Sequence, residues 1–215
     1  MGSEERGRGL VFIISAPSGT GKTTLVRAVM EELQDLQFSV SYTTRQPRAN
    51  EREGEDYHFV SPVVFEKMVE RGEFLEWAEV LGNRYGTALV NLGDFAARGM
   101  DLILDIDTQG AKKVLEKVDQ AVLIYILPPR LEALRERLVN RGLDSLEMIQ
   151  FRLDSAKRDI EEAHWYHYLI VNERIEDAIE KLKAIIVAER CRREKASVLE
   201  KMKKDWEVRH GKNYR

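Results

Sequence analysis

The stretch SAPSGTGKTT, residues 15–24, combines two glycines, a proline and a lysine directly after an apolar run. That run, GLVFIIS (residues 9–15), is rich in residues that favour strands and is bounded by turn residues. The following segment, KTTLVRAVMEELQ (residues 22–34), has apolar residues at helical spacing. A strand, a glycine-rich loop and a helix in this order predict a phosphate-binding loop, because backbone N–H groups and the positive end of a helix dipole favour an anion. The alternative is a glycine-rich turn with a surface lysine.

The loop follows the pattern G-x-x-x-x-G-K-[ST], except that Ala16 occupies the first glycine position. That position turns the chain out of the strand, where a methyl group can fit, whereas Gly19 and Gly21 let the backbone approach phosphate oxygens closely. Lys22 can reach the outer phosphates, and the Thr23 hydroxyl can be offered to Mg²⁺. The predicted phosphate-binding residues are Ala16, Pro17, Ser18, Gly19, Thr20, Gly21, Lys22, Thr23 and Thr24.

Strand-then-helix pairs recur along the rest of the chain. They occupy residues 100–107 and 108–118, residues 121–129 and 130–142, and residues 167–171 and 174–191. Continuous apolar strands that alternate with amphipathic helices predict a parallel sheet covered on both faces. The expected fold class is therefore α/β, with a doubly wound parallel sheet.

Composition and charge narrow the class of protein. A chain of 215 residues, 43% hydrophobic and 33% charged, is expected to form one globular domain. Its formal net charge of −3 argues against nucleic acid as a main partner, since a polyanion requires a basic surface. The apolar runs are strand-sized, which argues against a membrane span. The single Cys191 and the lack of a charged-then-apolar leader predict a cytoplasmic protein.

Residues 41–90 differ from the rest of the chain, because their expected strands are short and polar and are joined by charged loops. The strand segments are FSVSYTT, YHFV and EFLEWAEV. One helix is expected in SPVVFEKMVERG, with Ser61 as its N-cap and Pro62 as its first residue. We predict an α+β subdomain here, inserted into a core formed by residues 8–40, 91–136 and 159–190.

Two further segments stand apart from the predicted core. Residues 137–158 are helical in pattern, rich in arginine and broken at NRGLDS, and we predict that they form a mobile lid. Residues 191–215 are strongly charged with few apolar positions, which predicts a solvated C-terminal helix that frays.

A phosphate-binding loop leaves ATPase, GTPase, kinase and motor proteins all possible, so the second substrate must be found elsewhere. In the segment SYTTRQPRANEREGEDYHF, Arg45 and Arg48 are three residues apart and Tyr57 lies downstream. Guanidinium groups bind a phosphate monoester with two hydrogen bonds each, so this grouping predicts a phosphate site. The alternative is an exposed loop whose arginines pair with its own acids, which are Glu51, Glu53 and Glu55.

The chain resembles guanylate kinases over residues 10 to about 190. The resemblance rests on SAPSGTGKTT, SYTTRQPR, EGEDYHFV, EFLEWAEVLGNRYGT, LDIDTQG and RLVNRG, in the order and spacing of that family. It implies a P-loop NTPase-type fold with an inserted GMP-binding subdomain and a helical lid, and transfer of a phosphoryl group from ATP to GMP with Mg²⁺ as cofactor. Ala16 and the C-terminal extension depart from the family pattern.

The resemblance also implies roles for individual residues. The GMP phosphate would be held by Arg45, Arg48, Tyr57 and Tyr85, and the guanine would be read by Ser41, Glu76 and Thr87. The lid over ATP would supply Arg137, Arg141 and Arg152, and Asn172 would lie near the adenine. The residue type at Glu76 fits, because one carboxylate can accept hydrogen bonds from both guanine N1–H and N2–H₂, a pair that adenine lacks. The alternative for Glu76 is a solvent-facing position on a strand.

Asp105 and Asp107 are two residues apart in LDID and so lie on one side of a strand, near its C-terminal end. Ligands of open α/β sheets bind at that end. Asp105 is expected to hold Mg²⁺ together with Thr23, and Asp107 to orient Lys22 or the guanine amino group. The sequence does not decide which aspartate takes which role, and Asp107 could also cap the helix that starts at Thr108.

Phosphoryl transfer is expected to need positioning and positive charge rather than a protein nucleophile, since the attacking GMP oxygen is already anionic. Lys22, Mg²⁺ and the lid arginines would supply the charge, and Arg45 with Arg48 would orient the acceptor. Arg137 and Arg141 lie on one helix face, where they could instead pair with Glu132 or Glu136. Closure of the lid and of the GMP subdomain is expected to exclude water.

Two other classes of protein share parts of this pattern. A guanylate-kinase-like interaction domain uses the same fold to bind phosphorylated peptides, but it lacks a working phosphate loop, whereas this chain has Lys22 and Thr23. A phosphate-loop NTPase acting on RNA would need a basic groove, which the sequence does not indicate. We therefore expect an enzyme with small-molecule substrates. The sequence leaves open whether it is a monomer or a homodimer.

Overall fold

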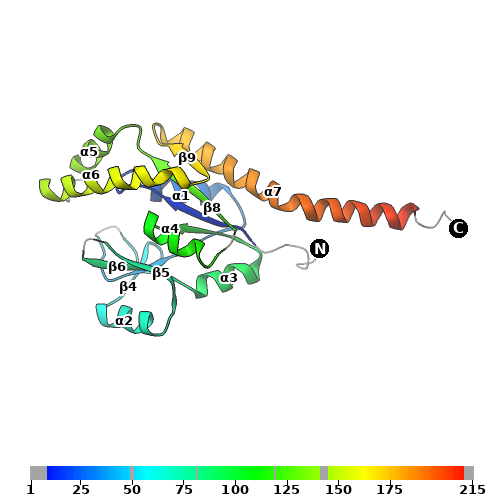
Figure 1. Ribbon diagram of the computed structural model, residues 1–215, viewed down its shortest axis with the longest axis horizontal. Helices are drawn as coiled ribbons and strands as arrows, with labels where there is room; N and C mark the ends of the chain where they lie inside the picture. The colour runs from blue at the N-terminus through cyan, green and yellow to red at the C-terminus, as the bar shows by residue number, and fades with distance from the viewer. Residues whose placement is uncertain (1–8, 49–50, 81, 119, 141–144, 211–215) are drawn as a thin grey trace.

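The structure is a computed structural model that describes residues 9–48, 51–80, 82–118, 120–140 and 145–210. Its larger sheet has five parallel strands in the order β2-β7-β1-β8-β9 (Figure 1). These strands are β1 (Val11–Ser15), β2 (Leu36–Phe38), β7 (Asp101–Asp105), β8 (Ala121–Leu127) and β9 (Tyr168–Val171). The doubly wound parallel sheet predicted from the sequence is therefore confirmed.

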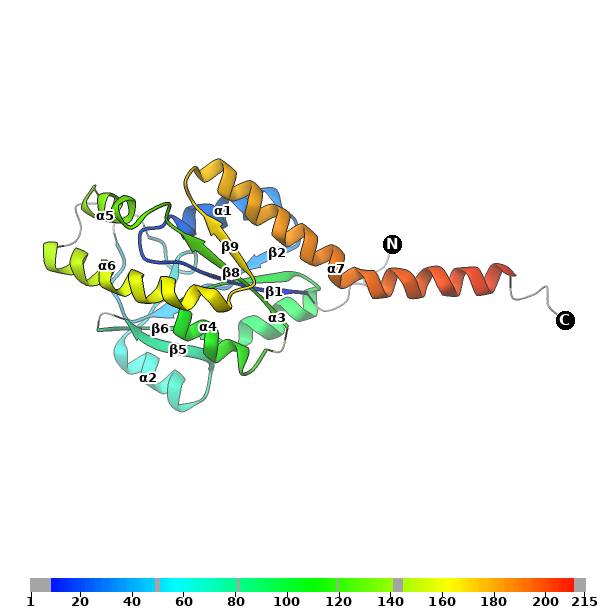
Figure 2. The ribbon, with the colours of Figure 1, turned by 45° about the horizontal axis from the view of Figure 1, so that its top comes forward.

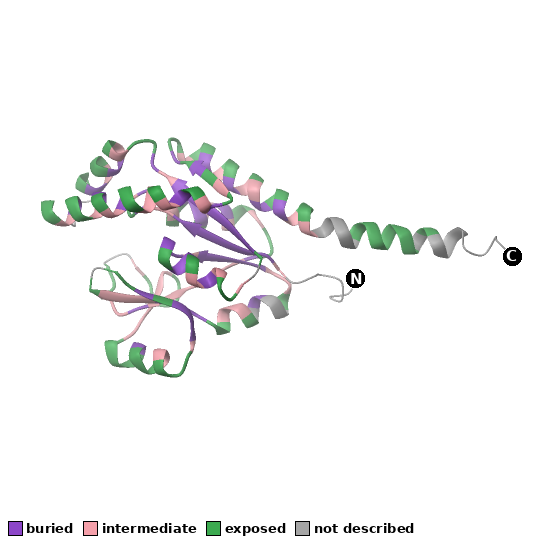
Figure 3. Ribbon diagram, in the orientation of Figure 1, coloured by how far each residue is buried: buried purple, intermediate pink, exposed green. Residues whose placement is uncertain are grey.

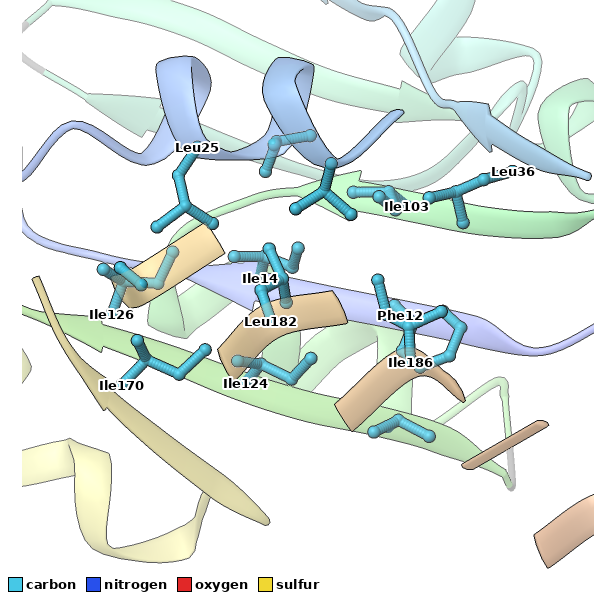
Figure 4. Close-up of a cluster of buried hydrophobic side chains, with 14 of the residues drawn as sticks. Phe12, Ile14, Leu25, Leu36, Ile103, Ile124, Ile126, Ile170, Leu182 and Ile186 are labelled. Carbon is cyan, nitrogen blue, oxygen red and sulfur yellow. The ribbon is translucent and has the colours of Figure 1, made fainter. Parts of the chain in front are cut away.

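Successive side chains of each buried strand point to opposite faces of the sheet, which divides the core into two layers. On β1, Phe12 and Ile14 face helices α1 (Lys22–Glu32) and α7 (Ile175–His210), as the close-up in Figure 4 shows. The neighbouring Val11 and Ile13 face the opposite layer. That layer is formed by α3 (Val90–Arg98), α4 (Thr108–Leu115) and the 3₁₀ helix η1 (Glu162–Trp165). Both faces of the sheet are thus covered, and Figure 3 shows its central strands as buried.

The second sheet has four strands in the order β4-β3-β6-β5 and is built from the predicted insertion. Its elements are β3 (Ser41–Thr43), β4 (Tyr57–Phe59), α2 (Pro62–Glu70), β5 (Phe74–Val80) and β6 (Asn83–Ala88). The predicted start of α2 is confirmed, because the Ser61 hydroxyl accepts a hydrogen bond from the Val64 N–H and Pro62 is the first helical residue. Phe65 of α2 stacks on Phe74 and anchors the helix to its sheet.

The expectation that FSVSYTT forms one strand of the insertion is wrong. Its first residue, Phe38, ends β2 and pairs with Ile103 in the parallel sheet, whereas Ser41–Thr43 form β3 in the other sheet. The chain therefore changes sheets within a run that looks continuous in sequence. The sequence analysis also does not predict β6 or α3. Both contain a glycine and mixed polar residues, so their structure depends on tertiary partners, such as the pairing of β6 with β3 and β5.

Two helices follow β8 and pack on each other through a small core of their own. They are α5 (Leu131–Asn140) and α6 (Leu146–Glu161), and their shared cluster consists of Leu134, Leu138, Ile149, Leu153 and Ala156. The helices extend past both ends of the predicted lid, residues 137–158. Arg137 lies inside α5 because the helical apolar spacing of Leu134 and Leu138 continues through it.

The last helix, α7, projects well beyond the sheets (Figures 1 and 2). Its backbone is helical as far as His210, and its side chains from Val198 to Lys204 are exposed. Where α7 leaves the body, the Arg190 Nε donates to Asp101 Oδ2 at 2.6 Å, and the other Asp101 oxygen accepts the Leu10 N–H at 2.7 Å. Asp101 is only 4% exposed, so this ion pair joins α7 to the edge of the core. Along the described part of the chain, no helix has the length and apolar character needed to cross a membrane.

Arg190→Ala is expected to lower the free energy of unfolding by about 3 kcal/mol, because it leaves the buried Asp101 without its main cation. Arg193, at 3.8 Å from Asp101, keeps the loss at the low end of the range for a broken buried pair. Denaturant unfolding would measure it. The matched control is Arg174→Ala, directly before the same helix, which removes a pair with Asp177 that is exposed on both sides and should cost less than about 1 kcal/mol. Equal effects of the two substitutions would contradict this account.

Candidate nucleotide-binding site

The predicted phosphate loop joins the end of β1 to the start of α1. Gly19 and Gly21 have φ angles of 93° and 94°, in the left-handed region that side chains disfavour. The Thr20 hydroxyl and N–H both donate to the Pro17 carbonyl, at 2.7 and 3.2 Å, which closes the turn. In this described segment no side chain caps α1, which begins at Lys22. The first N–H groups of α1 are therefore left for an anion.

Two residues from distant parts of the chain hold this loop in place. The Asn172 side-chain amide donates to the Thr20 carbonyl at 2.8 Å, and Arg137 Nη1 donates to the same carbonyl at 2.9 Å. Arg137 Nη2 also donates to the Asn172 carbonyl at 3.3 Å. In this structure both residues support the backbone of the loop. Their predicted contacts with ATP and adenine stay predictions.

A cavity of about 690 Å³ opens beside the loop, between the parallel sheet, the second sheet and α6. This is the size of a ligand site. The predicted site residues that line it are Ala16, Pro17, Ser18, Gly19, Thr20, Gly21, Lys22, Thr23, Thr24, Ser41, Arg45, Arg48, Tyr57, Glu76, Tyr85, Asp105, Asp107 and Arg152. Arg137, Asn172 and Thr87 lie outside this lining, and Arg141 lies outside the described residues.

The two aspartates of LDID both reach the cavity, from the end of β7 and the start of α4. Asp105 forms an ion pair with Lys22. Asp107 is the N-cap of α4, since its Oδ1 accepts the Gly110 N–H at 2.7 Å. The capping alternative for Asp107 is therefore confirmed, and its role toward the nucleotide stays a prediction.

Arg45 and Arg48 converge on one carboxylate. Arg45 donates to both oxygens of Glu51, at 2.9 and 2.8 Å, and the Arg48 N–H donates to Glu51 Oε2 at 2.8 Å. Burial opposes ionisation of Glu51, but the hydrogen bonds from Arg45 and Arg48 outweigh it and lower the pKa of this carboxyl. The alternative, in which the arginines pair with acids of their own loop, thus holds for Glu51, although the Arg45 and Glu51 side chains are largely buried and not exposed. The same pairing fixes the plane of the Arg45 guanidinium, which lies 5.4 Å from the centre of the Tyr57 ring.

Glu76 is the buried acid of the site. It lies on β5, is 7% exposed, and its Oε1 accepts the Thr87 hydroxyl at 2.7 Å. Burial raises the pKa of Glu76, and the nearby Asp107 adds to this effect. The alternative of a solvent-facing strand position is wrong. Thr87 is fully buried behind Glu76, so in this structure it orients the acid and does not face the cavity.

The lid contributes a face of α6 to the cavity. Arg152 Nη1 donates to the Ser18 hydroxyl at 2.5 Å, which brings it to the phosphate loop as predicted. The sequence analysis missed Met148, Phe151 and Asp159, which line the same cavity. Phe151 is 51% exposed. Helical spacing places Met148 and Asp159, four residues before and seven after Arg152, on the face of that arginine, whereas Phe151 is its immediate neighbour in the chain.

Comparisons with known proteins agree with this geometry. Residues 8–189 match the family model described as guanylate kinase. The guanylate kinase of Geobacter metallireducens is 52% identical over 184 residues, which cover 86% of this chain and 91% of that protein. The guanylate kinase of Syntrophotalea carbinolica is 51% identical over 86% of this chain and 88% of that protein. The crystal structure of guanylate kinase from Anaplasma phagocytophilum superposes with a TM-score of 0.72 at 36% identity, over 85% of this chain and 87% of that one.

Gly21→Ala is expected to weaken binding of a triphosphate at least tenfold. The new Cβ would be held at a φ of 94° and would lie 3.1 Å from the Asn172 amide nitrogen that supports the loop. Calorimetric titration with a non-hydrolysable ATP analogue would measure the loss. Gly72→Ala is the matched control, since Gly72 has a φ of 65° with no neighbour within 4 Å and lies far from the loop. This substitution should lower stability and leave the affinity unchanged, and unchanged affinity in Gly21→Ala would contradict the predicted role of the loop.

Proposed function

This chain belongs to the guanylate kinase family, and we infer that it catalyses the reversible transfer of the γ-phosphoryl group of ATP to GMP, giving ADP and GDP. It is a nucleoside monophosphate kinase, with ATP as phosphoryl donor. We extend the acceptor to dGMP, and we place the enzyme in purine nucleotide metabolism in the cytoplasm.

One observation supports the proposal that the site has two halves. The phosphate loop of the core and Arg45, Arg48 and Glu76 of the inserted subdomain line one and the same cavity. A triphosphate on the loop and a monophosphate on the arginines would therefore meet end to end. This arrangement supports in-line transfer between two nucleotides, which is what a kinase for small molecules requires.

We propose that the chemical step depends on positioning and charge. Arg45 and Arg48 would orient the GMP phosphate, with Tyr57 and Tyr85 beside it, so that its anionic oxygen attacks the γ-phosphorus as the bond to ADP breaks. Lys22 and Arg152, which reach the phosphate loop, would stabilise the negative charge on the oxygens of the transferring group. Arg137 and Arg141 are proposed to join them from the lid when it closes.

The residues present also fit a magnesium ion. Among the described residues no three acids, histidines or cysteines are grouped as a metal site. Mg²⁺ is usually held by one or two protein oxygens together with substrate phosphates, and the Thr23 hydroxyl and the Asp105 carboxylate both face the cavity. We propose that these two residues hold it, Asp105 through water. The bound ion would supply positive charge to the phosphates.

Selectivity for guanine is assigned to Glu76. Its carboxylate would accept the guanine N1–H and N2–H₂ donors, and Ser41 and Asp107 line the same part of the cavity. AMP would leave this buried carboxylate without those donors, at a cost of about 1–3 kcal/mol. Thr87 is proposed to act indirectly, by holding one oxygen of Glu76 at 2.7 Å.

The alternative function, a guanylate-kinase-like domain that binds phosphopeptides, is not favoured. Such a domain needs the arginines of the second sheet but has no use for Lys22 beside a phosphate loop whose glycines both adopt left-handed backbone conformations. A coupled assay with ATP and GMP separates the possibilities. ADP formation that requires GMP supports the kinase, whereas hydrolysis that is independent of GMP or stimulated by RNA counts against it.

Lys22→Ala is expected to lower kcat by 10²- to 10³-fold, because it removes one preorganised cation from the transferring phosphate. Binding of GMP should change only a few-fold, since its arginines lie on the other sheet. The coupled assay and calorimetry with GMP measure the two effects. Lys112→Ala is the control, because Lys112 pairs with the exposed Glu162 on the surface. A variant that keeps most of its turnover would refute the role assigned to Lys22.

Glu76→Gln is expected to reduce the preference for GMP over AMP by about 5- to 150-fold, which corresponds to one or two lost hydrogen bonds in a buried site. The pH dependence should change as well. GMP needs the ionised carboxylate of Glu76. Because burial raises the pKa of this group, GMP binding should begin to weaken at a higher pH than it would if the glutamate were exposed. This loss of GMP binding at low pH should be missing in Glu76→Gln, where only the GMP phosphate itself still titrates.

The matched control is Glu79→Gln, which changes an exposed acid on the same strand and cavity wall. It should keep both the preference for GMP and the loss of GMP binding at low pH. Steady-state kinetics with GMP and AMP between pH 5 and pH 8 would provide these comparisons. An unchanged preference in Glu76→Gln would mean that another residue reads the guanine.

A further inference from the structure

The chain passes between the two sheets at two places, and the first passage is a single residue. The Ser39 N–H still donates to the Ile103 carbonyl of the core sheet at 2.9 Å. Ser41 already pairs with Tyr57 in the second sheet. Val40 therefore carries the chain from one sheet to the other.

The second passage leads from β6 to α3. Ala88 pairs with Phe74, and the Leu89 N–H donates to the Glu73 carbonyl at 2.8 Å, so both belong to the second sheet. Helix α3 begins with the next residue, Val90, and packs against β7 of the core through Phe95. The change of sheet thus takes place between Leu89 and the first turn of α3.

Asn91, in that first turn, joins the two passages. Its side-chain amide donates to the Ser39 hydroxyl at 2.7 Å and to the Val40 carbonyl at 3.4 Å. Ser39 is almost completely buried, so this contact is shielded from water. We propose that Asn91 is a positioning residue for GMP, because it fixes the two chain passages to each other and so sets the angle between the halves of the site. The inference rests on the proposed function.

Other contacts also join the second sheet to the core. Helix α4 lies between β5 and the core strands (Figures 1 and 2), and Lys117, two residues beyond its end, donates to the Leu75 carbonyl of β5. The Leu75 side chain is fully buried in the core cluster. A second cavity, of about 550 Å³, lies between α1 and the second sheet; Val40 and Ser41 of the first passage help to line it, and the Arg27–Asp56 ion pair bridges it. A rotation about the Asn91 side would open or close the cleft.

The position of the Asn91 hydrogen bonds determines how their loss should change GMP binding. Both bonds of Asn91 are made at the passages, and neither bridges the cleft, so they do not oppose closure. Their loss would let the second sheet sample more orientations, and GMP would have to select the productive one from a larger set. Arg45 and Glu76 would then be displaced relative to Asp105, whereas the phosphate loop, which belongs wholly to the core, would be unaffected.

Asn91→Ala is therefore expected to raise KM and Kd for GMP about three- to tenfold, which is the loss of one to two hydrogen bonds. KM for ATP should stay within twofold. Ser39→Ala removes the partner of the shorter hydrogen bond and should also raise KM for GMP. The double variant should be no worse than Asn91→Ala alone, since both substitutions break one contact. Small-angle scattering should show that GMP with a non-hydrolysable ATP analogue compacts the wild type more completely than the variants.

Ser61→Ala is the matched control, because it removes one hydrogen bond of similar kind inside the second sheet's own helix, far from the passages. It should lower stability without changing KM for GMP. The inference is overturned if KM for GMP is unchanged or falls in Asn91→Ala, or if KM for both nucleotides rises equally. If Asn91→Ala does not fold, Ser39→Ala alone must raise KM for GMP. Failure of the proposed function is distinct, since the wild type would then form no ADP in response to GMP.

Discussion

The backbone amides at the start of α1 impose the main constraint on this molecule. They can bind phosphate only if the loop before them carries no side chain in the way and the helix points directly into the cleft. Gly19 and Gly21 meet the first condition with left-handed backbone conformations. The second is met because Leu25, Val26 and Val29 fix α1 on the parallel sheet, and because Asn172 and Arg137 hold the Thr20 carbonyl from behind. The protein's own contacts therefore define the shape of the loop in the absence of a nucleotide.

The charges of the site are balanced inside the protein. Lys22 is paired with Asp105, and Arg45 with Glu51, so these two cations predicted to meet phosphate already have carboxylate partners. This arrangement is consistent with a formal net charge of −3, since the positive charge is local and held in place. It also limits the conformational entropy lost on binding, because the Arg45 guanidinium is oriented in advance by two hydrogen bonds.

The two sheets serve different parts of the proposed reaction. The parallel sheet is buried on both faces and carries the loop proposed to bind the triphosphate, whereas the inserted subdomain carries the groups proposed for the acceptor and is joined to the core by two short chain passages. Phosphoryl transfer between two nucleotides requires both accurate positioning and exclusion of water. The proposed division into a fixed half and a half that rotates would meet both requirements.

The sequence by itself determined the local features: the phosphate loop, the strand-helix alternation of the core, the N-cap of α2, and the residue types of most of the cavity wall. These follow from short-range patterns, since glycine positions, apolar periodicity and capping depend on neighbours a few residues apart. Only the tertiary structure decided that FSVSYTT divides between two sheets, that β6 and α3 form, that Arg137 and Asn172 support the loop, and that Phe151 faces the cleft. Each of these depends on contacts between residues far apart in the chain, such as Phe38 with Ile103 or Asn172 with Thr20, and no local pattern specifies which distant groups will meet.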